Sequence, residues 1–309
     1  MYAFPPKRST IAAVATYEVK IVDAFTRVPY TGNPCGVITR ADGLDERQMQ
    51  AIARELNLSE TAFVFPSVRA DFAVRFFTPT KEIPLAGHPT IATMHALVEE
   101  GRIDLEGGRA RVTQELSIGL LPAEIEALPD GGVKVFMTQN PPEFGRRLDR
   151  TVYAQALGIS PDDILPDVPV QVVSTGTPQA MVPVRSLEVL RRLRPDFQHL
   201  SDLEQVGHYF STHVFTLEAI DAAHRAHCRH FAASAGVPED PVTGSAIGAM
   251  AAYLWRYGLV REPRYVVEQG HLIGRPGLVE VLVDAEGDEP RRVRIAGTAV
   301  TVLRGEICV

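Results

Sequence analysis

The sequence has few cysteines and no long apolar run. Its 309 residues include only Cys35, Cys228 and Cys308, which lie far apart and do not form the disulfide framework of a secreted protein. No stretch approaches the ~18 consecutive apolar residues that a membrane span requires. A short apolar run near the N-terminus does not reach the length of a signal peptide, and we interpret residues 1–16 as a disordered extension. These features indicate a cytoplasmic protein that does not cross a membrane.

Dense runs of basic residues are also missing. Lys and Arg number 31 against 38 Asp and Glu, which gives a formal net charge of −7 at pH 7. Binding to a nucleic-acid backbone requires clustered positive charge, so we expect no nucleic-acid partner. Hydrophobic residues make up 45% and charged residues 22% of the chain, which is typical of a globular enzyme. The length favours two domains of ordinary size.

Motifs for common cofactors and nucleophiles are absent as well. The sequence contains no dinucleotide fingerprint, phosphate-binding loop, HExxH or GxSxG motif, although Ser245 in TGSAIG superficially resembles the last. His224, His227, Cys228 and His230 are metal-ligand residue types. We expect them at a helix end that enters a strand, where their side chains diverge. We therefore predict no metal site and no cofactor.

Helical and strand patterns alternate along the chain. Residues 19–25, 61–65 and 73–77 are rich in strand formers, whereas 44–56 and 90–100 have helical spacing. The second of these helices is expected to begin directly after Gly87 and His88. Helices alternating with strands predict a mixed α/β (α+β) fold.

A break in this pattern suggests the domain boundary. The segment Asn140–Arg150 is rich in proline and charge and is the candidate linker. We predict an N-terminal domain over residues 17–139 and a C-terminal domain over 151–297. A C-terminal strand at about 298–309 is expected to complete the first domain, as the resemblance described below implies.

The two predicted domains share a weak repeat in the same order along the chain. The matched residues are Gly32, Asn33 and Pro34 with Gly176, Thr177 and Pro178; Ser59 and Phe63 with Ser211 and Phe215; Arg75 and Phe77 with Arg229 and Phe231; and Ile91, Met94 and Ala96 with Ile247, Met250 and Ala252. Single matches arise by chance, but their common order favours a duplication. Equivalent turns of two like domains would then face one cleft, where ligand sites usually form.

Two helix starts in this repeat have the character of anion sites. GHPTIATMHAL begins at Gly87 and DPVTGSAIGAMAAYL at Asp240, and the free N–H groups of a helix start attract negative charge. Isolated Thr90 and Ser245 would more often be helix caps, but the pairing of the two motifs favours function. We expect a small anionic substrate, bound by the turn residues Gly87, Thr243, Gly244, Asn33 and Gly176.

Glu60, in NLSETAFVF, is the candidate acid/base. It precedes an apolar strand, and its counterpart in the repeat is Thr212, so the pseudo-symmetric site has this carboxylate on one side only. A single carboxylate suits one acid/base that delivers and retrieves a proton. In the repeat Asp240 lies opposite His88, although each residue alone would more often be structural.

Several motifs together resemble the PhzF-like family of phenazine biosynthesis. They are VDAFTRVPYTGNPCGVI, LNLSETAFVF, RFFTPTKEIPLAGHPTIA, STGTPQAMVPV, EDPVTGSAIGAMAAYL, EQGHLIGRPG and GTAVTVLRGEI, and they extend from about Thr16 to the C-terminus. The resemblance implies the diaminopimelate-epimerase fold, in which two similar domains each wrap a sheet around a central helix. It also implies a homodimer that works without metal or organic cofactor.

The resemblance further assigns roles to the candidate residues. It implies that Glu60 is the acid/base and that His88, Asp240 and Ser245 orient and polarise the substrate. Characterised members isomerise trans-2,3-dihydro-3-hydroxyanthranilate by moving a proton between ring carbons. The thiol pair of diaminopimelate epimerase is replaced here by Ala86 and Asp240, which disfavours a two-thiol racemase.

Two other functions remain open at this stage. One is an amino-acid epimerase or racemase of the same fold, and the other is a non-catalytic binding or interaction protein, because a fold does not fix function. Ala86 and Pro89, in AGHPT, differ from many relatives and leave the substrate undetermined.

Overall fold

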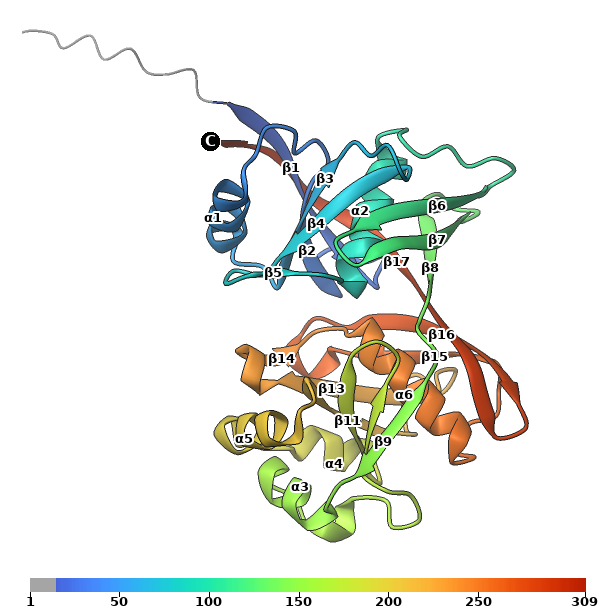
Figure 1. Cartoon of the computed structure of the whole chain (residues 1–309). Coiled ribbons are helices and arrows are strands. Elements are labelled where there is room, and N and C mark those ends of the chain that lie inside the picture. The colour runs from blue at the N-terminus through green and yellow to red at the C-terminus, as the bar shows by residue number, and fades with distance from the viewer. Residues whose placement is uncertain (1–14) are drawn as a thin grey trace, which may run out of the picture.

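A computed structural model describes residues 15–309, which form two halves stacked one above the other (Figure 1). All but the last two residues of the predicted extension 1–16 lie outside the described residues. The first half contains β1 (Thr16–Ala24), β2 (Asn33–Ile38), α1 (Glu46–Leu56), β3 (Glu60–Phe65), β4 (Phe72–Phe77), β5 (Glu82–Ile83), α2 (Gly87–Glu99), β6 (Arg109–Leu116), β7 (Gly119–Ala127) and β8 (Val133–Thr138).

The second half has a similar set of elements. They are β9 (Glu143–Arg147), α3 (Arg150–Leu157), β10 (Gln171–Ser174), β11 (Pro178–Pro183), α4 (Leu187–Arg192), α5 (Phe197–Gly207), β12 (Ser211–Thr216), β13 (Ala226–Ala232), β14 (Val237–Asp240), α6 (Gly244–Arg256), β15 (Arg264–Gln269), β16 (Gly277–Glu286) and β17 (Glu289–Cys308). Short 3-10 turns lie at Pro161–Asp163, Ala233–Ala235 and His271–Ile273.

Each half is built around one largely buried helix. Helix α2 contacts β1, β2, β3, β8 and β17, and α6 contacts β10, β11, β16 and β17. Ile91 and Met94 of α2, and Ile247 and Met250 of α6, are completely buried, so apolar side chains cover these helices on most sides, as expected for central helices. The predicted fold, with a sheet wrapped around a central helix in each half, is confirmed.

The repeat seen in the sequence corresponds to equivalent geometry. Strand β2 runs parallel to β3 and β3 antiparallel to β4; likewise β11 runs parallel to β12 and β12 antiparallel to β13. The guanidinium of Arg75 lies 5.2 Å from the ring centre of Phe77, and that of Arg229 lies 5.1 Å from the ring centre of Phe231. Both arginines also pair with a carboxylate of the next strand, Glu82 and Glu239 respectively.

Two connections join the halves. The chain passes from β8 to β9 and returns through the 20-residue strand β17 (Figure 1). The first part of β17 pairs with β16 and β8, and its last ten residues, from Ala299 to Cys308, pair with β1. The terminal segment of the chain is therefore built into the sheet of the first half.

Some element predictions were wrong in detail. The expected linker 140–150 contains strand β9, in which Phe144 pairs with Val173 of β10; Pro141 and Pro142 break the pattern only before this strand. Helix α2 begins at Gly87, three residues before the predicted start. Pro89 is compatible with this start because the first N–H groups of a helix have no intrahelical partner.

Three buried clusters of apolar side chains form the interior. The largest extends through both halves and includes Phe25, Phe76, Phe215 and Tyr253. A second lies under α3, α4 and α5, and a third joins α1 to β3 and β4. Among residues 15–309, no helix is both long enough and apolar enough to cross a membrane.

Candidate active site

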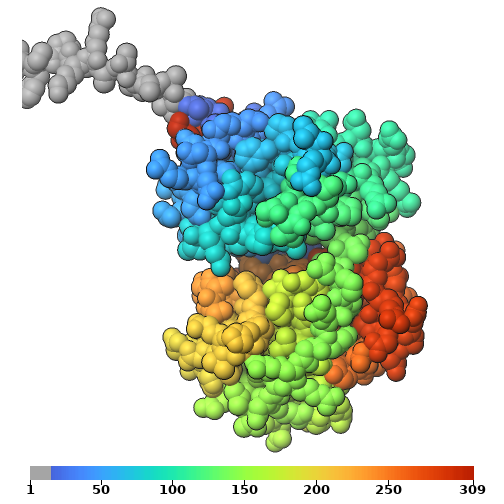
Figure 2. All heavy atoms as spheres, viewed as in Figure 1, coloured from blue at the N-terminus to red at the C-terminus, as the bar shows by residue number. Residues whose placement is uncertain are grey.

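The two halves face each other across a cleft. On the face shown in Figure 2, a hollow separates the atoms of the first half from those of the second. In Figure 1 the ends of β5 and β14 lie on opposite sides of this gap. Helices α2 and α6 begin beside these strands and contact each other, so the two helix starts predicted as anion sites lie in the same region of the molecule.

Glu60 is held at the beginning of β3, beside β2. It pairs in the parallel register with Cys35, and its side chain is 21% exposed. Its Oε2 atom is buried without a well-aligned hydrogen bond among the described residues and lies 3.3 Å from Nε2 of His88. Burial and the nearby charge of Asp240 raise the pKa of Glu60 to about 8, against a hydrogen bond from Ser59 that lowers it. Such a carboxyl can both hold and release a proton near neutral pH.

His88 lies in the first turn of α2. It is 7% exposed, and burial lowers its pKa to about 3, so the imidazole is neutral at physiological pH. Its Nε2 atom lies 3.4 Å from Oγ of Ser59 as well as close to Glu60. A neutral imidazole can donate or accept one hydrogen bond at this atom without adding a charge to the cleft.

Asp240, at the end of β14, is the carboxyl that the second half contributes to the site. Nδ2 of Asn33 donates to its Oδ1 at 2.9 Å, and Oγ1 of Thr243 donates to its Oδ2. Burial raises the pKa of Asp240 to about 6, and the hydrogen bonds from Thr243 and Asn33 oppose that rise. Oγ of Ser59 donates to Oδ1 of Asn33 at 3.1 Å, so one chain of polar contacts joins the carboxyls of the two halves.

The two helix starts have no side-chain cap. The capping positions are Ala86 for α2 and Thr243 for α6, and neither side chain accepts a hydrogen bond from its helix. The alternative interpretation of Thr90 and Ser245 as caps was wrong, because Oγ1 of Thr90 donates to the carbonyl of Ala86 and Oγ of Ser245 accepts from Gln179. Backbone N–H groups at both helix starts therefore remain available to an anion.

The remaining predicted residues occupy separate places. A Cβ atom built on Gly87 would meet no atom within 4 Å, so this helix start borders open space. Nε2 of Gln179 donates to Oγ of Ser245 at 3.3 Å, and Thr175, the neighbour of Gly176, donates to the carbonyl of Ser245 at 3.4 Å. Within residues 15–309, no hydrogen bond joins Ser245 to the group formed by Glu60, His88 and Asp240.

Residues without a predicted role complete the site. Nε2 of Gln269 donates to the carbonyl of Asp240 at 2.9 Å, and its Oε1 accepts from the backbone N–H of Thr243 at 3.2 Å. Gln269 thus fixes the turn between β14 and α6. Both Gln269 and Gln179 lie in motifs that the sequence analysis singled out, EQGHLIGRPG and STGTPQAMVPV, but their partners are distant in sequence.

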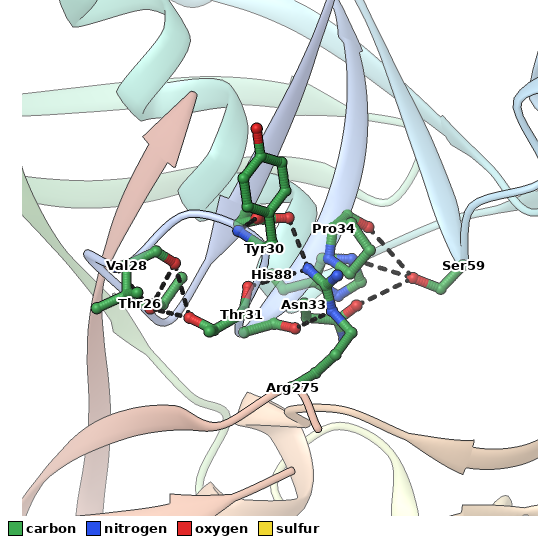
Figure 3. Close-up of polar contacts among 11 residues, drawn as sticks. Thr26, Val28, Tyr30, Thr31, Asn33, Pro34, Ser59, His88 and Arg275 are labelled. Carbon is green, nitrogen blue, oxygen red and sulfur yellow. Dashed lines mark hydrogen bonds and ion pairs between the residues drawn. The ribbon is translucent and has the colours of Figure 1, made fainter. Parts of the chain in front are cut away.

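Arg275 ties the second half to the loop that carries Asn33. Its Nη2 donates to Oδ1 of Asp23 at 2.7 Å and to the carbonyl of Thr31 at 3.0 Å, and its Nε donates to the carbonyl of Gly32 at 2.9 Å. Figure 3 shows Arg275 extending from the second half toward Thr31 and Asn33 of the first half. Arg275 therefore positions the Asn33 side of the site against Asp240.

The thiols do not supply an acid/base pair. Cys35 and Cys228 are buried, and burial raises the pKa of each thiol well above its usual value. Ala86 and Asp240 occupy the positions at which the resemblance places the epimerase thiols. A thiolate at either buried cysteine would be strongly disfavoured.

The histidine-rich segment differs partly from its prediction. It contains no helix end: His224 lies in the turn before β13, and the other three residues lie on this strand. The expected divergence is wrong for two of the four residues, because Nδ1 of His224 and Nδ1 of His227 both contact the carboxylate of Glu268; Cys228 donates instead to the carbonyl of Glu268. A different set, His227, Glu268 and His271, brings potential ligand atoms within 4.8 Å of one another.

Fold and site together define a class of enzyme. Two similar α/β halves face each other with a carboxyl of raised pKa on each side and two uncapped helix starts between them. This arrangement suits proton transfer on an anionic molecule. Solved structures with the same fold include a hydroxyproline epimerase from Agrobacterium vitis, with a TM-score of 0.63 and 14% identity over 95% of this chain and 93% of the epimerase.

Comparison with known proteins identifies the family. Residues 22–305 match the PhzC-PhzF family, described as phenazine biosynthesis-like protein, and the chain belongs to this family. The crystal structure of a Bacillus anthracis phenazine biosynthesis protein of the PhzF family superposes with a TM-score of 0.87 at 36% identity, covering 96% of this chain and all of that one.

Curated relatives are named isomerases. One from Clostridium acetobutylicum, an uncharacterized isomerase, is 40% identical over 95% of this chain and 99% of its own length. The trans-2,3-dihydro-3-hydroxyanthranilate isomerase of Pseudomonas chlororaphis is 36% identical over 93% of this chain and 98% of its own length. The chain is therefore an isomerase of the PhzF family.

Proposed function

We propose that the protein isomerises a small carboxylate-bearing metabolite by proton transfer, with Glu60 as the acid/base. The observation that carries this proposal is the placement of Glu60. Its buried Oε2 atom lies 3.3 Å from Nε2 of His88 and makes no well-aligned hydrogen bond among the described residues, and the pKa of Glu60 is raised to about 8. A carboxyl in this state exchanges a proton with a bound carbon acid.

The proposed reaction consists of two proton transfers by one group. Glu60, as the carboxylate, takes a proton from one substrate carbon; the electron pair of the broken C–H bond forms a new double bond to the next carbon, and the electrons of the existing double bond shift to a second carbon. The protonated Glu60 then returns the proton to a second carbon, so the product has the same atoms and charge as the substrate. His88, which is neutral, and Asp240 would form hydrogen bonds with the substrate while the negative charge of the deprotonated substrate is delocalised.

The substrate carboxylate has a natural place in this arrangement. The uncapped starts of α2 and α6 supply N–H groups, and Gly87 borders open space. We propose that Gly87, Thr243 and Gly244 bind the carboxylate and that Ser245 and Asn33 orient the ring or chain. Gly176, in the turn next to Thr175, would line the same cleft.

The relatives supply the first substrate to test. A relative at 36% identity is named trans-2,3-dihydro-3-hydroxyanthranilate isomerase, and we propose this compound or a close analogue as substrate. Proton NMR in D₂O should show ring-proton signals that change in the presence of the wild-type protein. Glu60→Gln, in which the side chain keeps its shape but loses the proton-accepting oxygen pair, should lower the rate by at least ~10²- to 10⁴-fold.

A matched control separates the site from general effects. Glu55 is an exposed carboxylate on α1, and Glu55→Gln should leave the rate unchanged. Glu60→Gln that reacts as fast as wild type would contradict the acid/base role. A second outcome is that the proton signals of this compound stay unchanged with wild-type protein while another small carboxylate takes up deuterium only when Glu60 is present. That result would contradict the proposed substrate but not the role of Glu60.

A further inference from the structure

A cavity between the two halves is lined by none of Glu60, His88 and Asp240. It has a volume of about 580 Å³ and is lined by both halves, with Phe25 and Thr31 on one side and Val266 and Leu278 on the other. His224, Glu268 and His271 also line it. The proposed isomerase chemistry uses none of these three polar side chains.

Glu268 is the centre of this polar group. Its Oε1 accepts from the N–H of Asp221 at 2.9 Å and from Nδ1 of His224 at 2.8 Å. Its Oε2 accepts from the N–H of Ile220 and from Nδ1 of His227, both at 2.8 Å. Each oxygen thus accepts one backbone N–H and one imidazole nitrogen. The carboxylate is ionised and can only accept.

This arrangement fixes the proton positions on the histidines. Because Nδ1 of His227 must donate to the carboxylate, Nε2 of the neutral ring carries a lone pair. His227 is completely buried, and its Nε2 has no hydrogen-bond partner among the described residues. Among the same residues, Nδ1 of His271 is also buried and makes no well-aligned hydrogen bond, and the two rings lie 4.9 Å apart, centre to centre.

Unpaired buried nitrogens of this kind call for a partner. A buried polar atom without a hydrogen bond costs free energy, and here two of them lie on adjacent rings. A histidine whose other nitrogen donates to a carboxylate is the usual form of a metal ligand, because the carboxylate sets the tautomer and raises the basicity of the ring. Glu268 stands in this relation to His227.

We propose that His227 and His271, with Glu268 beside them, bind a divalent transition-metal ion of the zinc class. Potential ligand atoms of the three residues lie within 4.8 Å of one another. Zinc–nitrogen bonds of ~2.0–2.1 Å in a tetrahedral site place two ligand atoms about 3.4 Å apart. His271 can close this difference, since it is only partly buried and lies in a short turn between Gly270 and Gly274, both of which have positive φ.

The chemistry of the donors selects the metal. Imidazole nitrogens suit zinc, copper, nickel and iron, whereas magnesium and calcium require oxygen ligands, and both oxygens of Glu268 are already occupied by N–H donors. The cavity next to His271 leaves the remaining coordination positions to water or to a small ligand. The same turn leads to Arg275, so a bound ion would also order the segment that contacts Asp23.

Titration of untagged, chelator-treated protein with zinc chloride tests the site. Calorimetry should show one ion per chain, and cobalt chloride should give the visible absorption of a four-coordinate ion with nitrogen ligands. His271→Ala should weaken zinc binding at least tenfold. His208→Asn is the matched control, because His208 is an exposed histidine in the left-handed region, which Asn tolerates; its zinc affinity should equal that of wild type.

The outcomes are decisive even if one variant fails to fold. His227→Gln removes a completely buried ring, so its thermal unfolding is measured first, whereas the partly exposed His271 is removed at little structural cost. No saturable zinc binding by the wild type, or equal affinity in wild type and His271→Ala, would overturn the proposal. Glu60→Gln should bind zinc as wild type does, so this site and the isomerase proposal fail independently.

Discussion

At the residue scale, the cleft combines three titratable side chains in unusual states. Burial lowers the pKa of His88 to about 3, while the pKa values of Glu60 and Asp240 are raised to about 8 and about 6. The charge of Asp240 is itself one cause of the shift of Glu60. At neutral pH the pair therefore tends to carry one negative charge instead of two, which leaves Glu60 ready to exchange a proton.

The shift of Glu60 predicts a stability change with pH. Since its pKa rises from 4.5 to about 8 on folding, the folded state holds more protons than the unfolded state between these values, and stability falls as pH rises through this window. Glu60→Gln removes this effect. We expect the variant to be more stable than wild type at pH 8, and one pKa unit already corresponds to about 1.4 kcal/mol.

Thermal unfolding at several pH values measures this difference. The gain of Glu60→Gln over wild type should be largest at and above pH 8 and should be absent at pH 4. Glu55→Gln, at an exposed position on α1, should show no such trend. A gain that is equal at pH 4 and pH 8 would mean that ionisation of Glu60 is not its cause.

At the element scale, the starts of the two central helices are equivalent in the repeat but packed differently. A Cβ atom on Gly244 would lie 2.4 Å from Cδ1 of Ile295 and 2.8 Å from Cζ of Phe25, whereas a Cβ atom on Gly87 would meet nothing within 4 Å. The start of α6 is therefore in close contact with the sheet and that of α2 borders the cleft. Only the start of α6 has no room for a side chain.

A pair of alanine variants tests this difference. Gly244→Ala should lower the free energy of unfolding by about 1–3 kcal/mol through overpacking. Gly87→Ala should change it by no more than about 0.5 kcal/mol. Urea unfolding of both variants gives the comparison, and equal losses would contradict the close packing at Gly244. Gly87→Ala adds a methyl group where the proposed substrate carboxylate binds, so its KM should rise while its stability is kept.

The elements could largely be predicted because local patterns determine them. Strands β3 and β4 follow alternating β-branched and aromatic residues, and α1 has an N-terminal Asp45 with Gln48 three residues later, which form a capping box. Strand β9 could not be predicted, because its sequence EFGRR is mostly polar and is a strand only through its pairing with β10. Pairing of this kind is tertiary and leaves no local pattern.

The candidate site was predictable in part for a similar reason. The motifs of the sequence contain Glu60, His88 and Asp240, and the structure places them together. Gln269 and Arg275 lie in another of these motifs, EQGHLIGRPG. Their roles depend on contacts with residues far away in the sequence, such as Asp23, which is 252 positions from Arg275. His227 was weighed as a metal ligand only with its neighbours in the sequence, and its proximity to His271, 44 positions further along the chain, leaves no local pattern.

At the scale of the whole molecule, an apolar cluster that extends through both halves is supplemented by covalent links and polar contacts. Strand β17 and the β8–β9 connection are covalent links, while Asn33 with Asp240 and Arg275 with Asp23 are two of the polar contacts between the halves. The guanidinium of Arg275 also holds the loop before Asn33 through two backbone carbonyls. The alignment of the carboxyls of Glu60 and Asp240 thus depends on Arg275, which lies outside the group that they form with His88.

Removing Arg275 should therefore affect stability and catalysis together. In Arg275→Ala the carboxylate of Asp23, with 2% of its side chain exposed, loses its counter-charge. Loss of a partner from a buried pair costs about 3–5 kcal/mol; because 29% of the Arg275 side chain is exposed, we expect about 1–3 kcal/mol. The rate of deuterium exchange should fall as well, since the loop that carries Asn33 is no longer held.

A second substitution distinguishes this mechanism from simple loss of packing. Asp23→Asn combined with Arg275→Ala removes the unpaired charge, so the double variant should be more stable than Arg275→Ala alone. Its exchange rate should nevertheless stay low, because the contacts of the guanidinium with Thr31 and Gly32 are still missing. Arg304→Ala, which removes an exposed pair with Glu99, should cost no more than about 0.5 kcal/mol. Full recovery of the rate in the double variant would show that Arg275 acts only by neutralising Asp23 and does not position the loop.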